Sequence, residues 1–228
     1  GISRFLGFDL MTNFRTPYFS KSLTEFWRRW HISLSSWFRD YVYISLGGSR
    51  AKPIRVNVNL FITFVVSGLW HGANWTFVIW GAIHGFFLII EKYFLKKIKL
   101  GNNLLLSTLS MIYTFSIVCF AWIFFRSNTV SDAFYIIKYM FSDFSQWTDF
   151  IAVSLKFRGM GLTPSDIMSS LAFLFFLIMI ETGVKSIKIK QLFERSNIIR
   201  WSVYYILLFS IIISFTKNNA ANFIYFQF

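Results

Sequence analysis

The chain of 228 residues is 55% hydrophobic and only 14% charged, against about 25% charged residues in ordinary soluble domains. Its apolar runs are about 20 residues long, the length an α-helix needs to cross a bilayer, and they favour a polytopic, all-α membrane protein over a soluble domain. The net charge is +13, and the basic residues cluster beside those apolar runs, which favours basic cytoplasmic loops over nucleic-acid binding. One cysteine, Cys119, excludes a disulfide framework and a multi-cysteine metal site.

The first 46 residues contain a loop followed by an amphipathic helix. Residues 1–20, with a turn at Pro17, predict a loop or linker. From Leu23 to Tyr41 apolar residues recur every three or four positions, which predicts a helix over 21–46. Its tryptophans and arginines suit the membrane interface, and a helical wheel places His31 at the edge of the apolar face.

Residues 56–94 are almost continuously apolar, which predicts two spans, or one span and a re-entrant piece. The break is expected between Ser67 and Asn74, where glycines interrupt the pattern. Further transmembrane helices are predicted at about 104–125, 166–183 and 201–217. Basic residues gather before the first and between the last two of these, so alternate loops are expected on the cytoplasmic side.

All three histidines lie in apolar or tryptophan-rich sequence within the first 84 residues: His31, His71 and His84. An ionisable side chain at membrane depth is costly, so each is a functional candidate, with a hydrogen bond to a backbone carbonyl as the alternative. His71 stands out because Gly68 and Gly72 allow close backbone approach and tryptophans flank it. That setting suits a general base. His84, between Gly81 and Gly85, is expected to serve helix packing.

The remaining polar residues favour structural roles. Glu25 and Asp40 are expected to pair with the neighbouring arginines, and Glu91 and Glu181 with nearby lysines. Asn74 is suited either to orient a ligand or to bond between helices. The chain has no metal-ligand spacing, nucleophile elbow or phosphate-binding glycine loop, so no metal site is expected.

Two stretches together resemble a known family. EFWRRWHISLSSWFRDYVYISLGGSR (residues 25–50) and NLFITFVVSGLWHGANWTFVIWGAIHGFFLIIEK (residues 59–92) resemble the membrane-bound O-acyltransferase family. Within it they are similar to the branch of the alginate O-acetyltransferase membrane subunit and of proteins that O-acetylate peptidoglycan. FAWIFFR (residues 120–126) and the C-terminal FIYFQF also look like that branch.

The resemblance implies a polytopic helical bundle, 1–228 as a single membrane domain, with a tunnel through it. Family members have further N-terminal helices, so the chain, which starts at Gly1, is expected to be the C-terminal part of a longer protein. The family's catalytic histidine corresponds to His71, in the Trp-His-Gly triplet, and a second family position to His31.

The resemblance also implies acyl transfer at the cytoplasmic (inner) membrane, with acetyl-CoA or another acyl thioester as donor and no tightly bound cofactor. The acceptor is expected to be an extracytoplasmic polysaccharide or a partner protein. Six further residues are expected to contact substrate or donor: Arg28, Arg29, Trp30, Trp70, Asn74 and Trp75. For the two arginines, CoA phosphates are the proposed ligands and solvated interfacial charge is the alternative.

Three other functions stay open. The D-alanyl transferase of teichoic acids shares both histidine positions with the chain. A transporter or channel also combines several spans with a buried histidine. An inactive fragment that acts as a scaffold is the third alternative.

Overall fold

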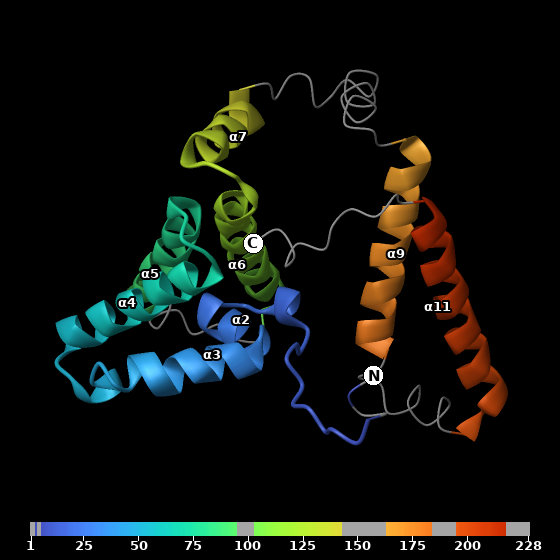
Figure 1. The fold of residues 1–228 in the computed structure, drawn as a ribbon, viewed down its shortest axis with the longest axis horizontal. Coiled ribbons are helices and arrows are strands. Elements are labelled where there is room, and N and C mark those ends of the chain that lie inside the picture. The colour runs from blue at the N-terminus through green and yellow to red at the C-terminus, as the bar shows by residue number, and fades with distance from the viewer. Residues whose placement is uncertain (1–2, 4–5, 95–102, 143–162, 184–194, 218–228) are drawn as a thin grey trace. The chain divides into compact units, whose positions relative to one another are not determined.

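The structure is a computed structural model that describes residues 3, 6–94, 103–142, 163–183 and 195–217. Within this part of the chain every regular element is helical, which confirms the all-α prediction (Figure 1). The chain divides into two compact units, Gly1–Asp143 and Phe144–Phe228, and the single membrane domain stays a prediction. The candidate site residues all belong to the first unit.

The first unit is built on a hairpin of two long helices, α4 (Pro53–His71) and α5 (Trp75–Phe94), with α6 (Leu104–Arg126) against α5 (Figure 1). All three are long and apolar enough to cross a membrane. Their turn falls at 72–74, inside the interval where the sequence predicts a break. α5 is the central helix, because 44% of its span is buried against 22% for each of the other two.

Glycines let the two helices of the hairpin touch backbone to backbone. A Cβ atom added to Gly68 would lie 2.2 Å from the carbonyl oxygen of Phe77, and one on Gly81 equally close to that of Phe64. Gly81 and Gly85 are four residues apart, the spacing that brings membrane helices into close contact. Side chains larger than hydrogen at these positions would force the helices apart.

The predicted continuous helix over 21–46 is wrong. The structure has two short helices, α2 (Leu23–Arg29) and α3 (Ile32–Phe38), followed by a π-helical turn, η2 (Arg39–Tyr43). Trp30 is extended and His31 is left-handed, with φ 42°. Both pieces keep helical spacing, so the sequence pattern continues across a break that it does not reveal. The wheel position predicted for His31 therefore does not apply.

The break is held by the preceding loop, which contains the 3-10 turn η1 (Pro17–Phe19). The Ile32 amide donates to the Asn13 carbonyl (3.0 Å) and the Ser33 amide to Asn13 Oδ1 (2.9 Å). These bonds satisfy amides that a continuous helix would have paired internally. The loop thus stabilises the change of direction at His31.

Glu91 anchors the start of α2. Its carboxylate accepts hydrogen bonds from the amides of Leu23 (2.6 Å) and Thr24 (3.1 Å), although 67 or more residues separate them in the chain. The predicted pairing of Glu91 with Lys92 is therefore wrong, because a helix N-terminus supplies a better partner for a buried carboxylate. Leu23 then packs with Leu88 in the core between α2, α5 and α6.

A helix that the sequence does not predict lies between the predicted spans at about 104–125 and 166–183. α7 (Val130–Ser142) begins with a reciprocal cap, because the Thr129 amide donates to Asp132 Oδ2 and the Asp132 amide to Thr129 Oγ1 (both 3.1 Å). The tetrapeptide Thr-Val-Ser-Asp is a recognisable signal for such a start. A 3-10 turn, η3 (Gly48–Arg50), completes the first unit.

The second unit contributes α9 (Pro164–Gly183) and α11 (Asn197–Lys217), where the sequence predicts helices at 166–183 and 201–217. Their described apolar stretches, 165–179 and 197–209, are shorter than the three spans of the first unit. The C-terminal FIYFQF, the lysines between these helices and the side chain of Glu181 lie outside the described residues.

Candidate active site at the turn of the hairpin

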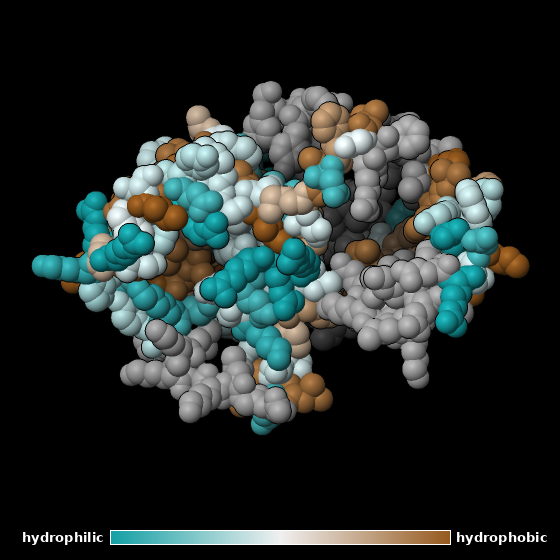
Figure 2. Space-filling model, turned by 90° about the horizontal axis from the view of Figure 1, so that it is seen from below, coloured by the Kyte–Doolittle hydropathy of each residue, from teal (hydrophilic) through white to brown (hydrophobic). Residues whose placement is uncertain are grey.

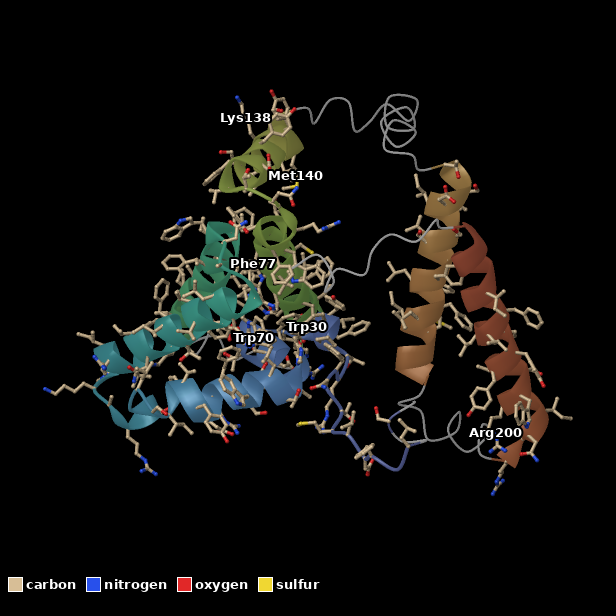
Figure 3. The ribbon with its side chains drawn as sticks, viewed as in Figure 1. Trp30, Trp70, Phe77, Lys138, Met140 and Arg200 are labelled. Carbon is tan, nitrogen blue, oxygen red and sulfur yellow. The ribbon has the colours of Figure 1, made fainter. Side chains whose placement is uncertain are left out.

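His71 is the last residue of α4 and is half-buried among aromatic rings. Its ring centroid lies 4.9 Å from that of Trp70, 5.0 Å from Phe125, 5.2 Å from Trp80 and 6.3 Å from Phe77. Trp70 and Phe77 come from the two arms of the hairpin and lie near its turn (Figure 3). The imidazole is thus enclosed by apolar faces at a point where the helix ends.

His31 lies at the break between α2 and α3, in a left-handed conformation that residues other than glycine rarely adopt. Its Nδ1 atom is buried and has no hydrogen-bond partner within the described residues. Such strained, unpaired groups often occur at functional sites. Phe14 covers one side of the ring, with the centroids 5.9 Å apart.

The structure brings His31 and His71 together. The two imidazoles lie within electrostatic reach of each other, although they come from different helices. Trp30, adjacent to His31, is stacked on Phe26, and Trp70, adjacent to His71, contacts Phe38 of α3, with ring centroids 5.6 Å and 6.2 Å apart. His71 thus lies inside the aromatic enclosure and His31 lies near it, an arrangement that suits proton transfer with restricted access of water.

Two residues of this enclosure escaped the sequence analysis. Trp80 and Phe125 contact His71. The sequence suggests Trp75 as a neighbour of His71 instead, but Trp75 is 73% exposed. Trp80 lies nine positions after His71, on the next helix, so helical spacing alone does not connect them. Phe125 belongs to the FAWIFFR stretch, which the family resemblance singles out without giving it a role.

His84 lies one ring away from His71 and is fully buried. Trp80 contacts both histidines, and Trp27 and Trp80 each have their centroids 5.0 Å from that of His84, at steep angles of 86° and 74°. Neither imidazole nitrogen has a hydrogen-bond partner within the described residues, and the same holds for both indole nitrogens. His84 is therefore part of the packed centre of the hairpin.

Two of the other residues expected to bind substrate or donor are engaged in bonds within the protein. Asn74 uses its amide for structure, since Nδ2 donates to the Asn128 carbonyl (2.8 Å) and Oδ1 accepts from the Thr76 amide (3.1 Å). Arg29 pairs with Glu25, one of the pairings predicted from the sequence.

Arg28 and Trp30 remain available to a ligand to different degrees. Arg28 is exposed and has no ion pair within the described part of the chain. Trp30 is half-buried, stacked on Phe26 with centroids 5.6 Å apart and in edge contact with Trp122 at 5.7 Å. Arg28 is thus the arginine of the pair that fits the expected anion contact.

A family model for the membrane-bound O-acyltransferases matches residues 5–130, more than half of the chain. The chain belongs to the membrane-bound O-acyltransferase family. The matched range contains all three histidines and every residue of the enclosure around His71. Membership and the three candidate spans together make it a multi-pass membrane protein.

Several curated relatives are similar to the chain. A probable alginate O-acetylase AlgI of Pseudomonas aeruginosa is 47% identical over 150 residues, which is 64% of this chain and 28% of that protein. A peptidoglycan O-acetyltransferase of Helicobacter pylori is 39% identical over 140 residues, which is 61% of this chain and 27% of that protein. A teichoic acid D-alanyltransferase of Bacillus subtilis is 33% identical over 139 residues, which is 56% of this chain and 35% of that protein. The matches thus span about a third or less of the relatives' lengths.

Proposed function

We propose that the chain carries the acyl-transfer site of an O-acetyltransferase in the cytoplasmic membrane, with His71 as general base. The observation that carries the proposal is His71 within an aromatic enclosure at the end of a membrane-spanning helix, with His31 near it. Family membership and the names of the O-acetylase relatives support the reaction class.

In the proposed step, a ring nitrogen of His71 takes the proton from the acceptor hydroxyl as its oxygen attacks the donor carbonyl. The carbon–sulfur bond of the thioester then breaks, and the thiolate leaves with a proton returned from the imidazolium. No net charge is created, and the acetyl group ends on the acceptor oxygen. The rings around His71 limit the access of water, which would otherwise hydrolyse the thioester.

His31 is proposed to orient the donor or to pass the proton between His71 and water. Its unpaired Nδ1 and its proximity to His71 support that role. Arg28, exposed beside the break, is proposed to attract the phosphates of a cytoplasmic thioester such as acetyl-CoA. The acceptor is proposed to be an extracytoplasmic polysaccharide, or a partner protein that completes the transfer.

The test is transfer of labelled acetyl groups from acetyl-CoA in vesicles that contain the full-length protein. His71→Ala is expected to lower the rate at least about 100-fold, the usual contribution of a general base. Tyr135→Ala is the control, because it removes an exposed aromatic side chain of α7 that lies outside the enclosure around His71. Near-normal transfer by a well-inserted His71→Ala protein would contradict the proposal.

D-Alanyl transfer is the second candidate, favoured by the match to the Bacillus subtilis enzyme. It predicts the same loss in His71→Ala but with a D-alanyl thioester as donor and no reaction with acetyl-CoA. A transporter predicts solute flux without consumption of either donor, and a scaffold predicts neither activity. The same vesicles therefore separate all four alternatives.

A further inference from the structure

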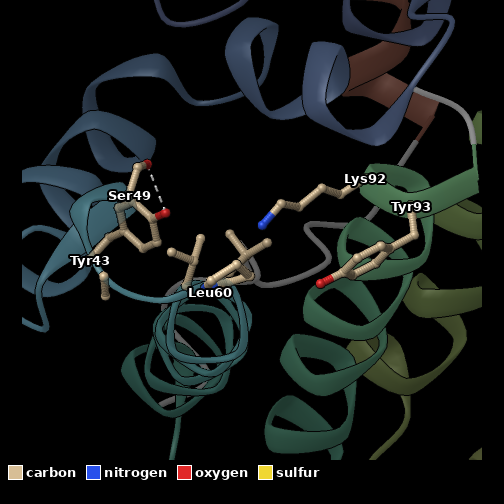
Figure 4. A pocket seen from close by; sticks show the side chains of 8 residues that line it. Tyr43, Ser49, Leu60, Lys92 and Tyr93 are labelled. Carbon is tan, nitrogen blue, oxygen red and sulfur yellow. Dashed lines mark hydrogen bonds between the residues drawn. The ribbon is translucent and has the colours of Figure 1, made fainter. Parts of the chain in front are cut away.

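A cavity of about 430 Å³ lies at the other end of the hairpin, away from the turn and His71 (Figure 4). Its floor is apolar and its rim is polar. The lining residues are Tyr43, Ser49, Ala51, Pro53, Val56, Leu60, Lys92 and Tyr93. This volume is in the range of small-ligand sites and is larger than that of an ordinary packing defect.

The polar groups of the rim are held in place by hydrogen bonds. Lys92 Nζ donates to Asn57 Oδ1 (3.0 Å), and Asn57 Nδ2 donates to the Tyr93 hydroxyl oxygen (2.7 Å). Across the cavity, the hydroxyls of Tyr43 and Ser49 are bonded to each other (3.0 Å). The ammonium group of Lys92 points into the space between the helices (Figure 4). Of its three donors, one is used by Asn57, so the others are free to bind an anion.

Uncompensated positive charge surrounds this rim. Arg50, Lys52 and Arg55 are all exposed beside it. Within the described residues the ion pairs are Glu25 with Arg29 and Asp40 with Arg39, so these three cations and Lys92 have none. In the face drawn in Figure 2, hydrophilic residues lie on the left, the side on which α3 and the start of α4 lie in Figure 1, as well as at the centre and the right edge.

The cavity also lies where the spans end. The candidate spans run over Pro53–His71 and Trp75–Tyr93, so its lining includes the first residue of one and the last residue of the other. The tyrosines of the rim are typical of the interface between hydrocarbon and headgroups. The floor, with Val56 and Leu60, continues into the apolar side of α4.

We infer that this cavity binds the phosphate group of an anionic phospholipid. The phosphate lies at Lys92 and the tyrosine hydroxyls, the exposed cations attract it, and the glycerol and the start of an acyl chain cover Val56 and Leu60. A soluble phosphate compound matches the charge of the rim but leaves the apolar floor in water. The site is separate from the proposed acyl-transfer site and does not depend on it.

The experiment measures lipid retention by the purified full chain in a neutral detergent, using native mass spectrometry. Phosphatidylglycerol is titrated against phosphatidylcholine, whose headgroup has the same phosphate but no net charge. Wild type is expected to retain one phosphatidylglycerol at concentrations at which phosphatidylcholine is lost. Equal retention of the two lipids would overturn the inference.

Lys92→Gln is expected to weaken phosphatidylglycerol binding about tenfold, because it removes a charge-assisted contact. Lys138→Gln is the matched control. Both lysines are exposed and lie over a neighbouring tyrosine ring, Lys92 at 5.9 Å from Tyr93 and Lys138 at 5.8 Å from Tyr139, but only Lys92 lines the cavity. Equal losses in the two variants would mean a general attraction to charge and would contradict a site.

Two further arms identify the occupant. Ala51→Trp keeps every charge and fills the cavity, so it is expected to lower retention as much as Lys92→Gln does. Unchanged retention in this variant would contradict binding inside the cavity. Acetyl-CoA and inorganic phosphate are added as competitors and are expected to leave the lipid in place. Displacement by acetyl-CoA, with Lys92→Gln weakening acetyl-CoA binding, would assign the cavity to the donor instead.

Discussion

The turn and the middle of the α4–α5 hairpin each hold a histidine, in opposite settings. At the turn, His71 is half-buried where a helix ends, and His31 lies near it. In the middle, His84 has no exposed surface and stands between Gly81 and Gly85, where the helix backbones meet. Trp80 contacts both rings, with centroids 5.2 Å from His71 and 5.0 Å from His84.

The difference shows that an apolar, tryptophan-rich sequence context does not by itself identify a reactive histidine. The two histidines differ in the backbone around them. His71 lies where a helix ends, so a substrate can approach its ring. His84 lies inside a continuous, closely packed helix, so a substrate cannot approach its ring. Changes in the middle of the hairpin should therefore alter stability, and changes at the turn should alter chemistry.

The largest effect on stability is expected from Gly81→Ala. The new methyl group would lie 2.2 Å from the Phe64 carbonyl oxygen, so the helices must separate, and overpacking of this kind costs about 1–3 kcal/mol. Gly85→Ala is the graded control, because its Cβ would lie 3.1 Å from the Phe61 Cα atom. Thermal unfolding in detergent should give a lower midpoint for Gly81→Ala than for Gly85→Ala. The reverse order would show that the backbone contact at Gly81 is not tight.

Glu91→Ala is expected to come next, because it leaves the buried amide of Leu23 and the partly buried amide of Thr24 without their acceptor. The loss of such a partner costs about 1–3 kcal/mol, and Glu91→Gln, which keeps an acceptor oxygen, should lose less. Because α2 leads directly into the break at His31, the alanine variant should also lose acyl transfer. Full activity together with normal stability in Glu91→Ala would rule out this anchoring role.

His84→Phe is expected to have a small effect of the opposite sign. It replaces two buried, unpaired nitrogens by carbon in a ring of similar size, so stability should stay the same or rise by about 1 kcal/mol. Unfolding midpoints of this variant and of wild type provide the measurement. A large loss of stability would reveal a hydrogen bond to His84 from water or from a chain segment outside the described residues.

The smallest effect concerns Tyr18, in the loop before α2, where burial raises the pKa of the phenol. A raised pKa in the folded chain means that folding favours the protonated phenol. The contribution of Tyr18 to folding stability is therefore fully present below the unfolded pKa of about 10 and is lost as pH rises through the higher pKa of the folded chain. The absorbance of phenolate at alkaline pH, wild type minus Tyr18→Phe, should show a tyrosine that ionises later than a free one. Ionisation at the pH of free tyrosine would show that the partial burial of Tyr18, which is 44% exposed, does not affect its phenol.

Sequence patterns predicted the long helices and the break between Ser67 and Asn74 because hydrophobic length and glycine positions are local properties. They failed at 21–46, since the bonds that break the helix at His31 come from Asn13, a distant contact that no periodicity records. The cap at Thr129 is a local signal, Thr-Val-Ser-Asp, that is sufficient to predict the start of α7. Trp80 and Phe125 were beyond reach, because their contact with His71 depends on how α4, α5 and α6 pack.

The most direct test of the account is the rate of labelled acetyl transfer by His71→Gln and His84→Phe, measured side by side in vesicles with the full-length protein. The account predicts that His71→Gln loses at least about 100-fold in rate while its unfolding midpoint stays within a few degrees of wild type. His84→Phe should keep most of the rate. Retained activity in His71→Gln, or its loss in a folded His84→Phe protein, would contradict the assignment of chemistry to the turn.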